Sequence, residues 1–318
     1  MVSDLTGMQL ANASLLDEST AAAEAMSMLF SLRTREQKKV NANKLFVSDQ
    51  ILPQNLEVLT TRAIPLGIKL VVGSELDIVY NSSYFGAIFQ YPGKHGQIIN
   101  LSSAIRKAKA FDIKTIVAAD LLSLTLLEAP GKYGVDVVVG TTQRFGIPLG
   151  YGGPHAAYYA TKEEYKRSIP GRIIGQTIDL DGNPALRMAL QTREQHIKRD
   201  RATSNICTAQ VLLAVMAGMY GAYHGPDGLK SIAKKIHNDT KELENSLLEL
   251  GYLNVNDYYF DTLKIKCDAY TICKLAKSIN INFNFIDNNH VGISLNETTD
   301  NNSIKEIIRV FKNLKVID

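Results

Sequence analysis

The sequence predicts an α/β protein, with a large domain around a mainly parallel sheet at residues 1–225 and a small α+β domain at residues 226–318. Two observations support this prediction. Short apolar runs of strand type alternate with helical patterns up to about residue 160, and this alternation favours a parallel sheet with helices on both faces. From about residue 228 a smaller unit follows. Its predicted elements are helix 229–250, strand 260–266, helix 269–278, strand 282–286, strand 291–295 and helix 303–311.

The large domain begins with a predicted helix at 20–32, where small and apolar residues recur at helical spacing after a segment rich in N-cap residues. Each strand that follows is a short apolar run bounded by polar or turn residues. In such a sheet, ligands are expected at the carboxyl ends of the strands. The predicted strands are 44–47, 69–72, 85–90, 115–119, 135–139 and 156–160, with helices at 53–64 and 101–110 between them.

The bulk composition excludes several classes of protein. The net charge of +3 is too small to argue for nucleic acid or a membrane surface as a partner. Cys207, Cys267 and Cys273 form no Cys-x-x-Cys pair and the histidines no His-x-x-x-His pair, so neither a disulfide framework nor a metal site is expected. The apolar run at 208–223 is shorter than the roughly 20 residues of a membrane-spanning helix, and it predicts a buried helix instead.

The amino terminus carries no basic region followed by an apolar core, so a secretory signal is not expected. Residues 1–10 begin in mid-pattern, without a capping signal before a periodic segment, which indicates that the chain starts inside a longer protein. A reducing compartment is the default for a chain with this cysteine usage.

The most distinctive segment is the turn after the predicted strand 135–139, followed by the Gly/Pro-rich loop 146–154. In enzymes that hold pyridoxal phosphate (PLP) as a Schiff base, a lysine amine occupies such a turn. Gln143 has no nucleophilic amine, and the guanidinium of Arg144 stays protonated. The segment therefore has the pattern of a PLP-lysine loop from which the lysine is missing.

Asp120 directly follows the predicted strand 115–119 and is expected to face the ligand crevice. In PLP enzymes an aspartate in this position pairs with the pyridine nitrogen. The alternative is that Asp120 caps a helix that starts at residue 121. The order of the segments favours the first interpretation, because the next strand leads into the lysine-type turn; both remain open.

Two segments rich in short polar side chains, 11–20 and 202–206, precede predicted helices. A helix start with free N–H groups suits a phosphate, although both segments also fit ordinary caps. The strongest charge cluster, 191–201, lies between them and contains Arg193 and Arg199. It predicts either a solvated, self-paired face or a site for phosphate or an acidic partner, with RNA as a lesser option because no aromatic residues are interleaved.

Taken together, these segments resemble the N-terminal half of the PLP-dependent P-protein family of the glycine cleavage system, the glycine decarboxylases. The resemblance covers nearly the whole chain. The segments that carry it are 8–18 (MQLANASLLDE), 143–155 (QRFGIPLGYGGPH), 190–199 (LQTREQHIKR), 202–208 (ATSNICT), 260–264 (FDTLK) and 292–297 (GISLNE).

The resemblance implies a type I PLP-dependent transferase-like fold, in a family whose two similar halves are fused in one chain or split into two subunits. The catalytic lysine of that family lies in the C-terminal half, in a loop of the form HKTFCIPHGGGGP. Aligning the shared Ile-Pro and Gly-Gly-Pro places that lysine opposite Gln143 and the preceding histidine opposite Thr142. The chain would then have no catalytic residue of its own, and Asp120, Thr142 and Gln143 would line a vestigial pocket.

The resemblance also implies partners. The chain would pack against the half that carries the PLP lysine, in a dimer-like assembly. Thr203, Ser204 and Asn205 would reach the partner's cofactor phosphate. Asn12 and Ser14 would line the shared pocket or pack between the halves.

In the complete enzyme, glycine would lose its carboxylate as carbon dioxide with the help of PLP, and its aminomethyl group would pass to the lipoyl arm of the H-protein. This chain alone would hold no covalent PLP and would be inactive. The family works in the bacterial cytoplasm and in mitochondria, so the expected location depends on the source.

Two alternatives remain. Instead of the non-catalytic half of a larger enzyme, the chain would be an autonomous PLP enzyme that uses Lys132 or Lys162, or a stand-alone binding or regulatory protein without catalysis. Neither lysine lies in the turn after the predicted strand 135–139, which disfavours the first alternative.

Overall fold

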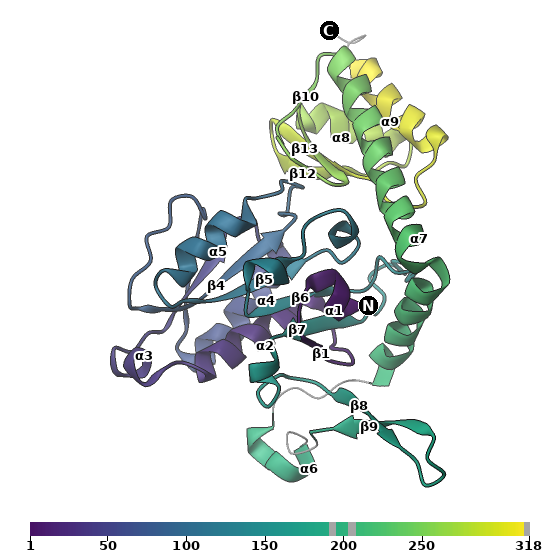
Figure 1. Cartoon of the computed structure of the whole chain (residues 1–318). Coiled ribbons are helices and arrows are strands. Elements are labelled where there is room, and N and C mark those ends of the chain that lie inside the picture. The colour runs from purple at the N-terminus through teal and green to yellow at the C-terminus, as the bar shows by residue number, and fades with distance from the viewer. Residues whose placement is uncertain (191–194, 203–207, 315–318) are drawn as a thin grey trace. The chain divides into compact units, whose positions relative to one another are not determined.

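Figure 1 shows the computed structural model of the chain, which describes residues 1–190, 195–202 and 208–314. The chain forms two compact units. The first consists of Met1–Tyr91 and Asn100–Gly225, and the second of Pro92–Ile99 and Pro226–Asp318. The chain therefore passes from one unit to the other at residues 91/92, 99/100 and 225/226.

A seven-stranded sheet in the order β1-β7-β6-β5-β4-β2-β3 forms the centre of the first unit. Neighbours from β3 to β6 pair in parallel, whereas β7 is antiparallel to β6 and β1 is antiparallel to β7. The predicted α/β class with a mainly parallel sheet is thus confirmed. The strands are β1 (Leu10–Ala11), β2 (Lys44–Ser48), β3 (Lys69–Gly73), β4 (Tyr84–Tyr91), β5 (Lys114–Ala119), β6 (Val137–Thr141) and β7 (Ala157–Thr161).

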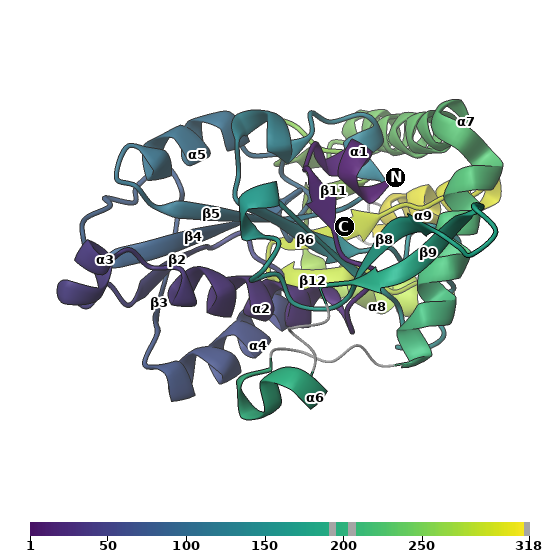
Figure 2. The ribbon, with the colours of Figure 1, turned by 60° about the horizontal axis from the view of Figure 1, so that its bottom comes forward.

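Helices cover both faces of this sheet, with α5 (Leu101–Lys109) on one face and α2 (Glu18–Ser31) and α4 (Pro53–Ala63) on the other (Figure 2). Small side chains let α2 approach β5 and β6 closely, because its alanines are fully buried in the core. Asp17 Oδ1 accepts a hydrogen bond from Thr20 N at 2.7 Å and fixes the start of α2. The short helices are α1 (Val2–Thr6), α3 (Arg35–Lys39), α6 (Gln195–Lys198), η1 (Ile64–Leu66), η2 (Ser123–Thr125), η3 (Pro130–Tyr133), η4 (Glu163–Tyr165) and η6 (Arg199–Arg201).

Sequence analysis did not predict the β-hairpin of β8 (Ile173–Ile178) and β9 (Pro184–Ala189), which pair only with each other among the described strands. On one face of the hairpin, Ile174, Ile178 and Leu186 are exposed to solvent. An isolated two-stranded hairpin is marginally stable in water. The apolar face of this hairpin is thus unusual for a surface that stays in solvent.

Helix α7 (Thr208–Glu249) is broken at Gly225, whose φ of 61° and ψ of 179° are not helical and which precedes Pro226. The first part, up to this break, belongs to the first unit, where Tyr220 packs edge-to-face on Phe145. The expectation that the run 208–223 is a buried helix was wrong for this chain, because apolar periodicity identifies a helix but not what covers it. Its exposed apolar residues, spaced so as to form one stripe, are Val211, Leu212, Val215, Met216, Met219 and Tyr223.

The second unit has an antiparallel four-stranded sheet in the order β10-β11-β13-β12. Its core contains Leu263, Ile265, Ile272 and Phe311, which are all fully buried. Besides the second part of α7, the elements are β10 (Leu253–Asn254), β11 (Thr262–Lys266), α8 (Ala269–Ser278), β12 (Asn284–Asp287), β13 (His290–Ser294) and α9 (Asn301–Leu314).

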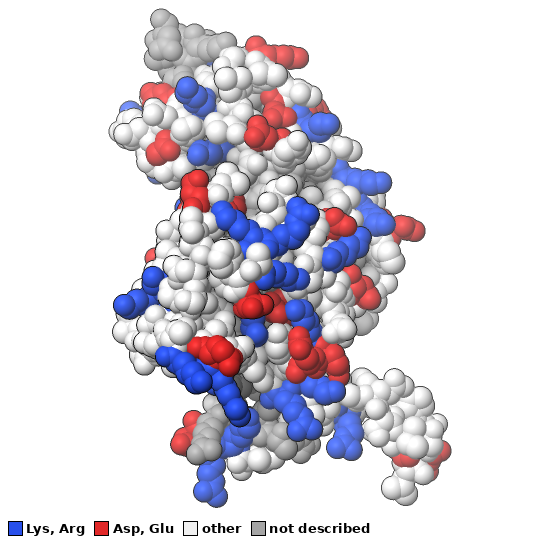
Figure 3. Space-filling view, turned by 60° about the vertical axis from the view of Figure 1, so that its left-hand side comes forward, with Lys and Arg blue, Asp and Glu red and all other residues white. Residues whose placement is uncertain are grey.

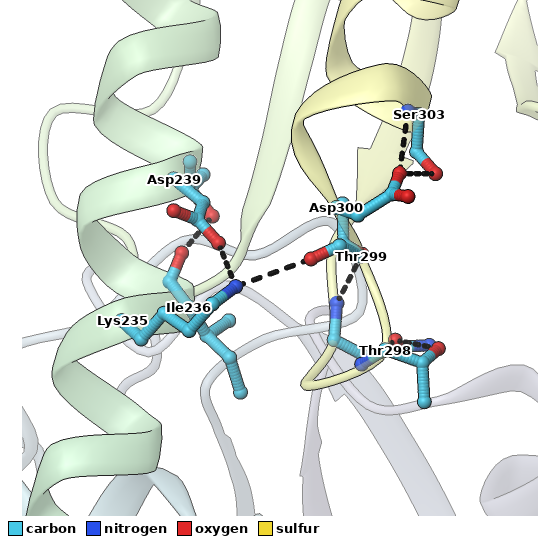
Figure 4. Close-up of polar contacts among 9 residues, drawn as sticks. Lys235, Ile236, Asp239, Thr298, Thr299, Asp300 and Ser303 are labelled. Atoms are coloured by element: carbon cyan, nitrogen blue, oxygen red, sulfur yellow. Dashed lines mark hydrogen bonds and ion pairs between the residues drawn. The ribbon is translucent and has the colours of Figure 1, made fainter.

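Polar contacts tie α7 to the loop before α9 within this unit (Figure 4). Lys235 Nζ lies 2.6 Å from Asp239 Oδ2 and donates to the carbonyl of Thr299 at 3.1 Å. Asp300 Oδ1 accepts from Ser303 N at 2.7 Å and satisfies one of the free N–H groups at the start of α9.

Residues 92–99, which the sequence placed in the large domain, belong to the second unit. Ile98 N donates to Tyr258 O at 2.9 Å, and Asn256 Nδ2 donates to His95 O at 2.7 Å. Gly96 has a φ of +89°, and a Cβ at this position would collide with the carbonyl of Thr262. Contacts that are distant in sequence therefore attach this loop to β11.

Candidate functional site

The carboxyl ends of β4, β5 and β6 lie next to each other in the sheet, where a parallel α/β protein forms its ligand crevice. Gln90 lies near the end of β4, Asp120 directly follows β5, and Thr141 ends β6. The backbone N of Asp120 donates to Tyr91 O at 3.0 Å, which joins two of these ends. The residues that the sequence singled out at Asp120, Thr142 and Gln143 thus come together at one edge.

Both carboxylate oxygens of Asp120 are engaged. Oδ1 accepts from Leu122 N at 3.0 Å, which stabilises a local turn. No helix begins at residue 121 as the alternative interpretation required, because residues 121 and 122 form this turn and η2 starts at Ser123. Oδ2 accepts from Arg144 Nη1 at 3.0 Å. The side chains of Arg144 and Asp120 are 26% and 22% exposed, so the ion pair is largely shielded from solvent. Asp120 therefore caps a turn and faces the crevice at once, and its partner in the crevice is Arg144.

Gln143 occupies the turn directly after β6. Its backbone N donates to Thr141 Oγ1 at 3.1 Å, and Thr141 Oγ1 lies 2.7 Å from His155 Nδ1. Its side chain lines an open hollow of about 620 Å³. The other residues that line this hollow are Leu149, Gly150, Tyr151, Gly152, Gly153 and His155.

Thr142, by contrast, points into the fold. Its backbone N and its Oγ1 donate to the carbonyl of Ala156, at 2.8 and 2.9 Å. The side chain is buried. Thr142 thus fastens the turn to the start of β7, and its hydroxyl is already used for that purpose.

Sequence analysis missed a second carboxylate at this edge. Glu18, in the first turn of α2, accepts from Asn55 Nδ2 at 2.7 Å and from Gln90 Nε2 at 3.3 Å. Burial raises the pKa of Glu18, with smaller contributions from the negative charges of Asp120 and Asp17, while its two hydrogen bonds lower the pKa. In the sequence, Glu18 stands out only as part of the capping segment 11–20, because its hydrogen-bond partners Asn55 and Gln90 lie far away along the chain.

Asn12 and Ser14 are buried at the β7 edge of the sheet. Asn12 Oδ1 accepts from Tyr159 N at 3.1 Å, and Asn12 Nδ2 donates to Ser14 O at 3.4 Å. Asn12 N donates to Tyr159 O at 3.0 Å. These hydrogen bonds continue the pairing of β1 along β7.

Thr203, Ser204, Asn205 and Arg193 lie outside the described residues. In the remainder of the charge cluster, the residues of α6 are exposed. Lys and Arg side chains are interspersed with Asp and Glu side chains on the face shown in Figure 3, as the small net charge leads one to expect. The described residues contain no grouping of His, Cys, Asp and Glu that could hold a metal ion, and no helix among them is suited in length and polarity to crossing a membrane.

The two lysines considered for an autonomous PLP site lie elsewhere. Lys162 Nζ pairs with Asp136 Oδ1 at 2.6 Å, and the neighbouring Thr161 is paired with Val137, at the amino end of β6. Lys132 lies on η3 and faces Glu128 at 3.4 Å. Neither amine is at the edge that holds Asp120.

Comparisons with known proteins support the resemblance seen in the sequence. A family model described as "Glycine cleavage system P-protein" matches residues 1–311. The "Glycine dehydrogenase (decarboxylating)" of Christiangramia forsetii is 61% identical over 314 residues, and that of Flavobacterium johnsoniae is 59% identical over 310 residues. The matches cover 99% and 98% of this chain but 33% of each relative. The chain thus spans about a third of the length of the curated relatives it matches.

Solved structures give the same relationship. A crystal structure of glycine decarboxylase (P-protein) of the glycine cleavage system, in inhibitor-bound form, has a TM-score of 0.88 at 27% identity and covers 99% of this chain and 74% of that chain. The apo cysteine desulfurase from Thermococcus onnurineus NA1 has a TM-score of 0.64 at 16% identity, covers 98% of this chain and 81% of that chain, and shows the shared fold alone. The chain therefore belongs to the glycine cleavage system P-protein family.

Proposed function

We propose that this chain is the non-catalytic half of a glycine decarboxylase, whose other half carries the PLP lysine. The observation that carries this proposal is Gln143 in the turn after β6, where the family motif places the lysine in its catalytic half. An amide has no nucleophilic amine and cannot bind the cofactor covalently. The family membership of the chain supports the proposal, as does its length of about a third of its curated relatives.

The residues of this chain do not fit covalently held PLP. Gln143 offers no amine, and the carboxylate that would face the pyridine nitrogen, Asp120, already accepts from Leu122 N and Arg144. PLP supplies an electron sink for loss of a carboxylate, and in the complete enzyme we assign its binding to the lysine-bearing half. The share of this chain is to close and shape the partner's site.

Two exposed apolar surfaces of the first unit, one on the β8–β9 hairpin and one on α7, support the proposal that the chain packs against a partner with an apolar surface. Ile178 and Leu186 on the hairpin are 72% and 77% exposed, and Met219 and Tyr223 on α7 are 65% and 86% exposed. Apolar faces of this kind on a soluble chain mark interaction sites. We assign both surfaces to the lysine-bearing half, because about two thirds of the length of the relatives lies outside this chain.

The complete assembly is proposed to decarboxylate glycine and to transfer the aminomethyl group to the lipoyl arm of the H-protein. The two halves would associate as the two monomers of a type I PLP dimer do. The site of action would be the cytoplasm in a bacterium and the mitochondrion in a eukaryote. Neither nucleic acid nor a membrane has a place in this function.

Thr203, Ser204 and Asn205 are proposed to reach the cofactor phosphate of the partner. They lie outside the described residues, and the proposal rests on their short polar side chains ahead of α7 and on the family resemblance. The double variant Thr203→Val, Ser204→Ala is expected to weaken the binding of PLP to the assembled enzyme. Unchanged PLP affinity in a fluorescence titration would contradict this assignment.

The function is tested by mixing the chain with the lysine-bearing half and following exchange of labelled bicarbonate into glycine in the presence of H-protein. Each half alone is expected to be inactive, and the mixture active. Turnover by this chain alone would support the autonomous enzyme. A mixture in which the two chains neither associate nor exchange bicarbonate would support the stand-alone binding protein.

A further inference from the structure

We infer that the guanidinium of Arg144 has taken the place of the cofactor's protonated ring nitrogen as the partner of Asp120. The vestigial pocket of this half would then differ from a PLP site in two ways. It lacks the lysine, and an ion pair between Arg144 and Asp120 occupies the place of the cofactor ring nitrogen. The inference rests on the proposed function in one respect, the assignment of Gln143 to the lysine position. Its consequence is that Gln143→Lys alone does not restore covalent binding of PLP.

The geometry of the ion pair carries this inference. Arg144 Nη1 lies 3.0 Å from Asp120 Oδ2, and Leu122 N occupies the other oxygen at 3.0 Å. A protonated pyridine nitrogen would need one of these oxygens, at the same crevice-facing edge of the sheet. Because both oxygens already accept hydrogen bonds, a cofactor ring has to displace Arg144 before it reaches Asp120.

The charges at this edge explain why displacement is unfavourable. Asp120 is close enough to Glu18 for its negative charge to raise the pKa of Glu18. Among the residues that the structure describes, the hydrogen-bond partners of the Glu18 carboxylate are the neutral amides of Asn55 and Gln90. Arg144 contributes a positive charge that offsets the carboxylate of Asp120. Separating a largely shielded ion pair costs more than losing an exposed one, because little solvent reaches the two groups to replace their mutual contact.

The backbone of the turn fixes the position of Arg144. Phe145 N donates to Thr142 O at 2.9 Å, and Ile147 N donates to Gln143 O at 3.1 Å. Phe145 is fully buried and packs on Tyr220. Arg144 lies between Gln143, which occupies the position of the lysine, and the buried Phe145. The same turn therefore lacks the amine that would bind PLP and carries the cation that pairs with Asp120.

The test uses the full chain with Gln143→Lys, alone and combined with Arg144→Met, which keeps an unbranched apolar stem but removes the guanidinium and its charge. Each protein is incubated with PLP and borohydride and analysed by intact mass and peptide mapping. The introduced amine and the cofactor aldehyde condense with loss of water, and borohydride adds hydride to the C=N bond to give a stable amine. At subsaturating PLP, we expect at least roughly tenfold less labelling of Q143K than of Q143K/R144M at residue 143. Tenfold corresponds to about 1.4 kcal/mol, slightly more than an exposed ion pair supplies, and the Arg144–Asp120 pair is largely shielded from solvent.

The matched control is Q143K/R62M, which removes another guanidinium of this unit that pairs with a shielded carboxylate, that of Glu24 at 3.2 Å. It is expected to label like Q143K. Equal labelling of Q143K and Q143K/R144M would overturn the inference. So would the absence of labelling in both folded proteins, because Arg144 would then not be what closes the pocket.

A second measurement applies even if Q143K/R144M does not fold. A thermal-unfolding cycle with Asp120→Asn, Arg144→Met and the double variant is expected to be non-additive, with a smaller loss of Tm in the double variant than the two single losses together. Additive losses would overturn the ion pair as a unit. Neither measurement uses the lysine-bearing half, so a failure to restore decarboxylation would count against the proposed function and not against this inference.

Discussion

The hydroxyl of Tyr158 on β7 donates a hydrogen bond of 2.7 Å to the carbonyl of Ala119 at the end of β5. Strand β6 lies between these two strands, and the tyrosine ring crosses it next to Gly140, which has no side chain. Burial raises the pKa of Tyr158 well above its ordinary value, and the negative charges of Glu18 and Asp120 add to the effect. The phenol therefore stays protonated and can act as a donor. This hydrogen bond holds the carbonyl directly before Asp120 and so helps to fix the edge of the sheet where the candidate site lies.

Gly140→Ala is expected to break this relationship. An added Cβ would meet the carbonyl of Ala119 and the ring of Tyr158, both of which are buried, and overpacking of this kind costs about 1–3 kcal/mol. The midpoint of thermal unfolding is the measurement. Gly73→Ala on β3 is the control, since a Cβ there has only an ordinary contact with Phe46, at 3.8 Å. Equal Tm values for the two variants would contradict the role of Gly140.

The buried Glu18 predicts a pH-dependent difference between the natural chain and Glu18→Gln. Its pKa in the folded chain is raised above the ordinary value of 4.5, so the folded state binds more protons than the unfolded state between the two pKa values. Its contribution to stability is then largest below the unfolded pKa and is lost as the pH rises through the folded pKa. The Tm of the natural chain minus that of E18Q should therefore fall as the pH is raised from below 4.5 to neutrality.

The amide in E18Q keeps an oxygen for Asn55 and Gln90, so it matches the natural chain in everything but charge and one added donor. A Tm difference that stays constant or rises over the same pH range would show that Glu18 carries its charge without penalty. The pKa shift of Glu18 would then be wrong in direction.

Substitution by alanine is expected to destabilise the chain more at Gly96, in the loop 92–99, than at Gly67, although both glycines have a positive φ. Gly96→Ala should destabilise the second unit by more than the cost of its φ alone, because the added Cβ meets the backbone of Thr262. Gly67→Ala, at φ +66° with open space around it, isolates the conformational cost of a left-handed backbone, about 1–2 kcal/mol. Chemical denaturation of both variants gives the comparison. A loss of unfolding free energy in G96A no greater than in G67A would contradict the close contact.

Substitutions on the exposed apolar face of the β8–β9 hairpin are expected to weaken association with the lysine-bearing half without destabilising the chain itself. Ile178→Ser with Leu186→Ser should leave the Tm of the isolated chain nearly unchanged, because both side chains are exposed. The same change should weaken association with the lysine-bearing half by about 2 kcal/mol or more, as the loss of apolar anchors does. Isothermal titration measures the affinity. Ile64→Ser, at a side chain that is also 73% exposed, is the control and should bind normally.

Much of the fold could be predicted because the parallel strands β2, β4, β5 and β6 are largely buried and read as continuous apolar runs. The predicted strand 85–90 lies within β4, and the predicted strand 115–119 differs from β5 by one residue at its start. The β8–β9 hairpin was missed, since its apolar residues are interrupted by Gly, Asp, Asn and Pro around the turn. Burial of α7 could not be predicted either, because exposure depends on what covers a face.

The site was predictable in part for a similar reason. Asp120 and Gln143 follow strands directly, so sheet topology brings them together. Glu18 is held at this edge by Asn55 and Gln90, which lie 37 and 72 residues from it along the chain. Arg144 was discounted as a nucleophile, and its role as a counter-charge depends on a contact across 24 positions that no local pattern contains.

We have proposed that Gln143 makes this chain the half without a cofactor lysine. Borohydride trapping of PLP in the assembled enzyme, followed by peptide mapping of both halves, shows which half binds the cofactor covalently. We expect one stoichiometric adduct on the lysine-bearing half and none on this chain. A stoichiometric adduct on any lysine of this chain would contradict the claim and assign it a cofactor site of its own.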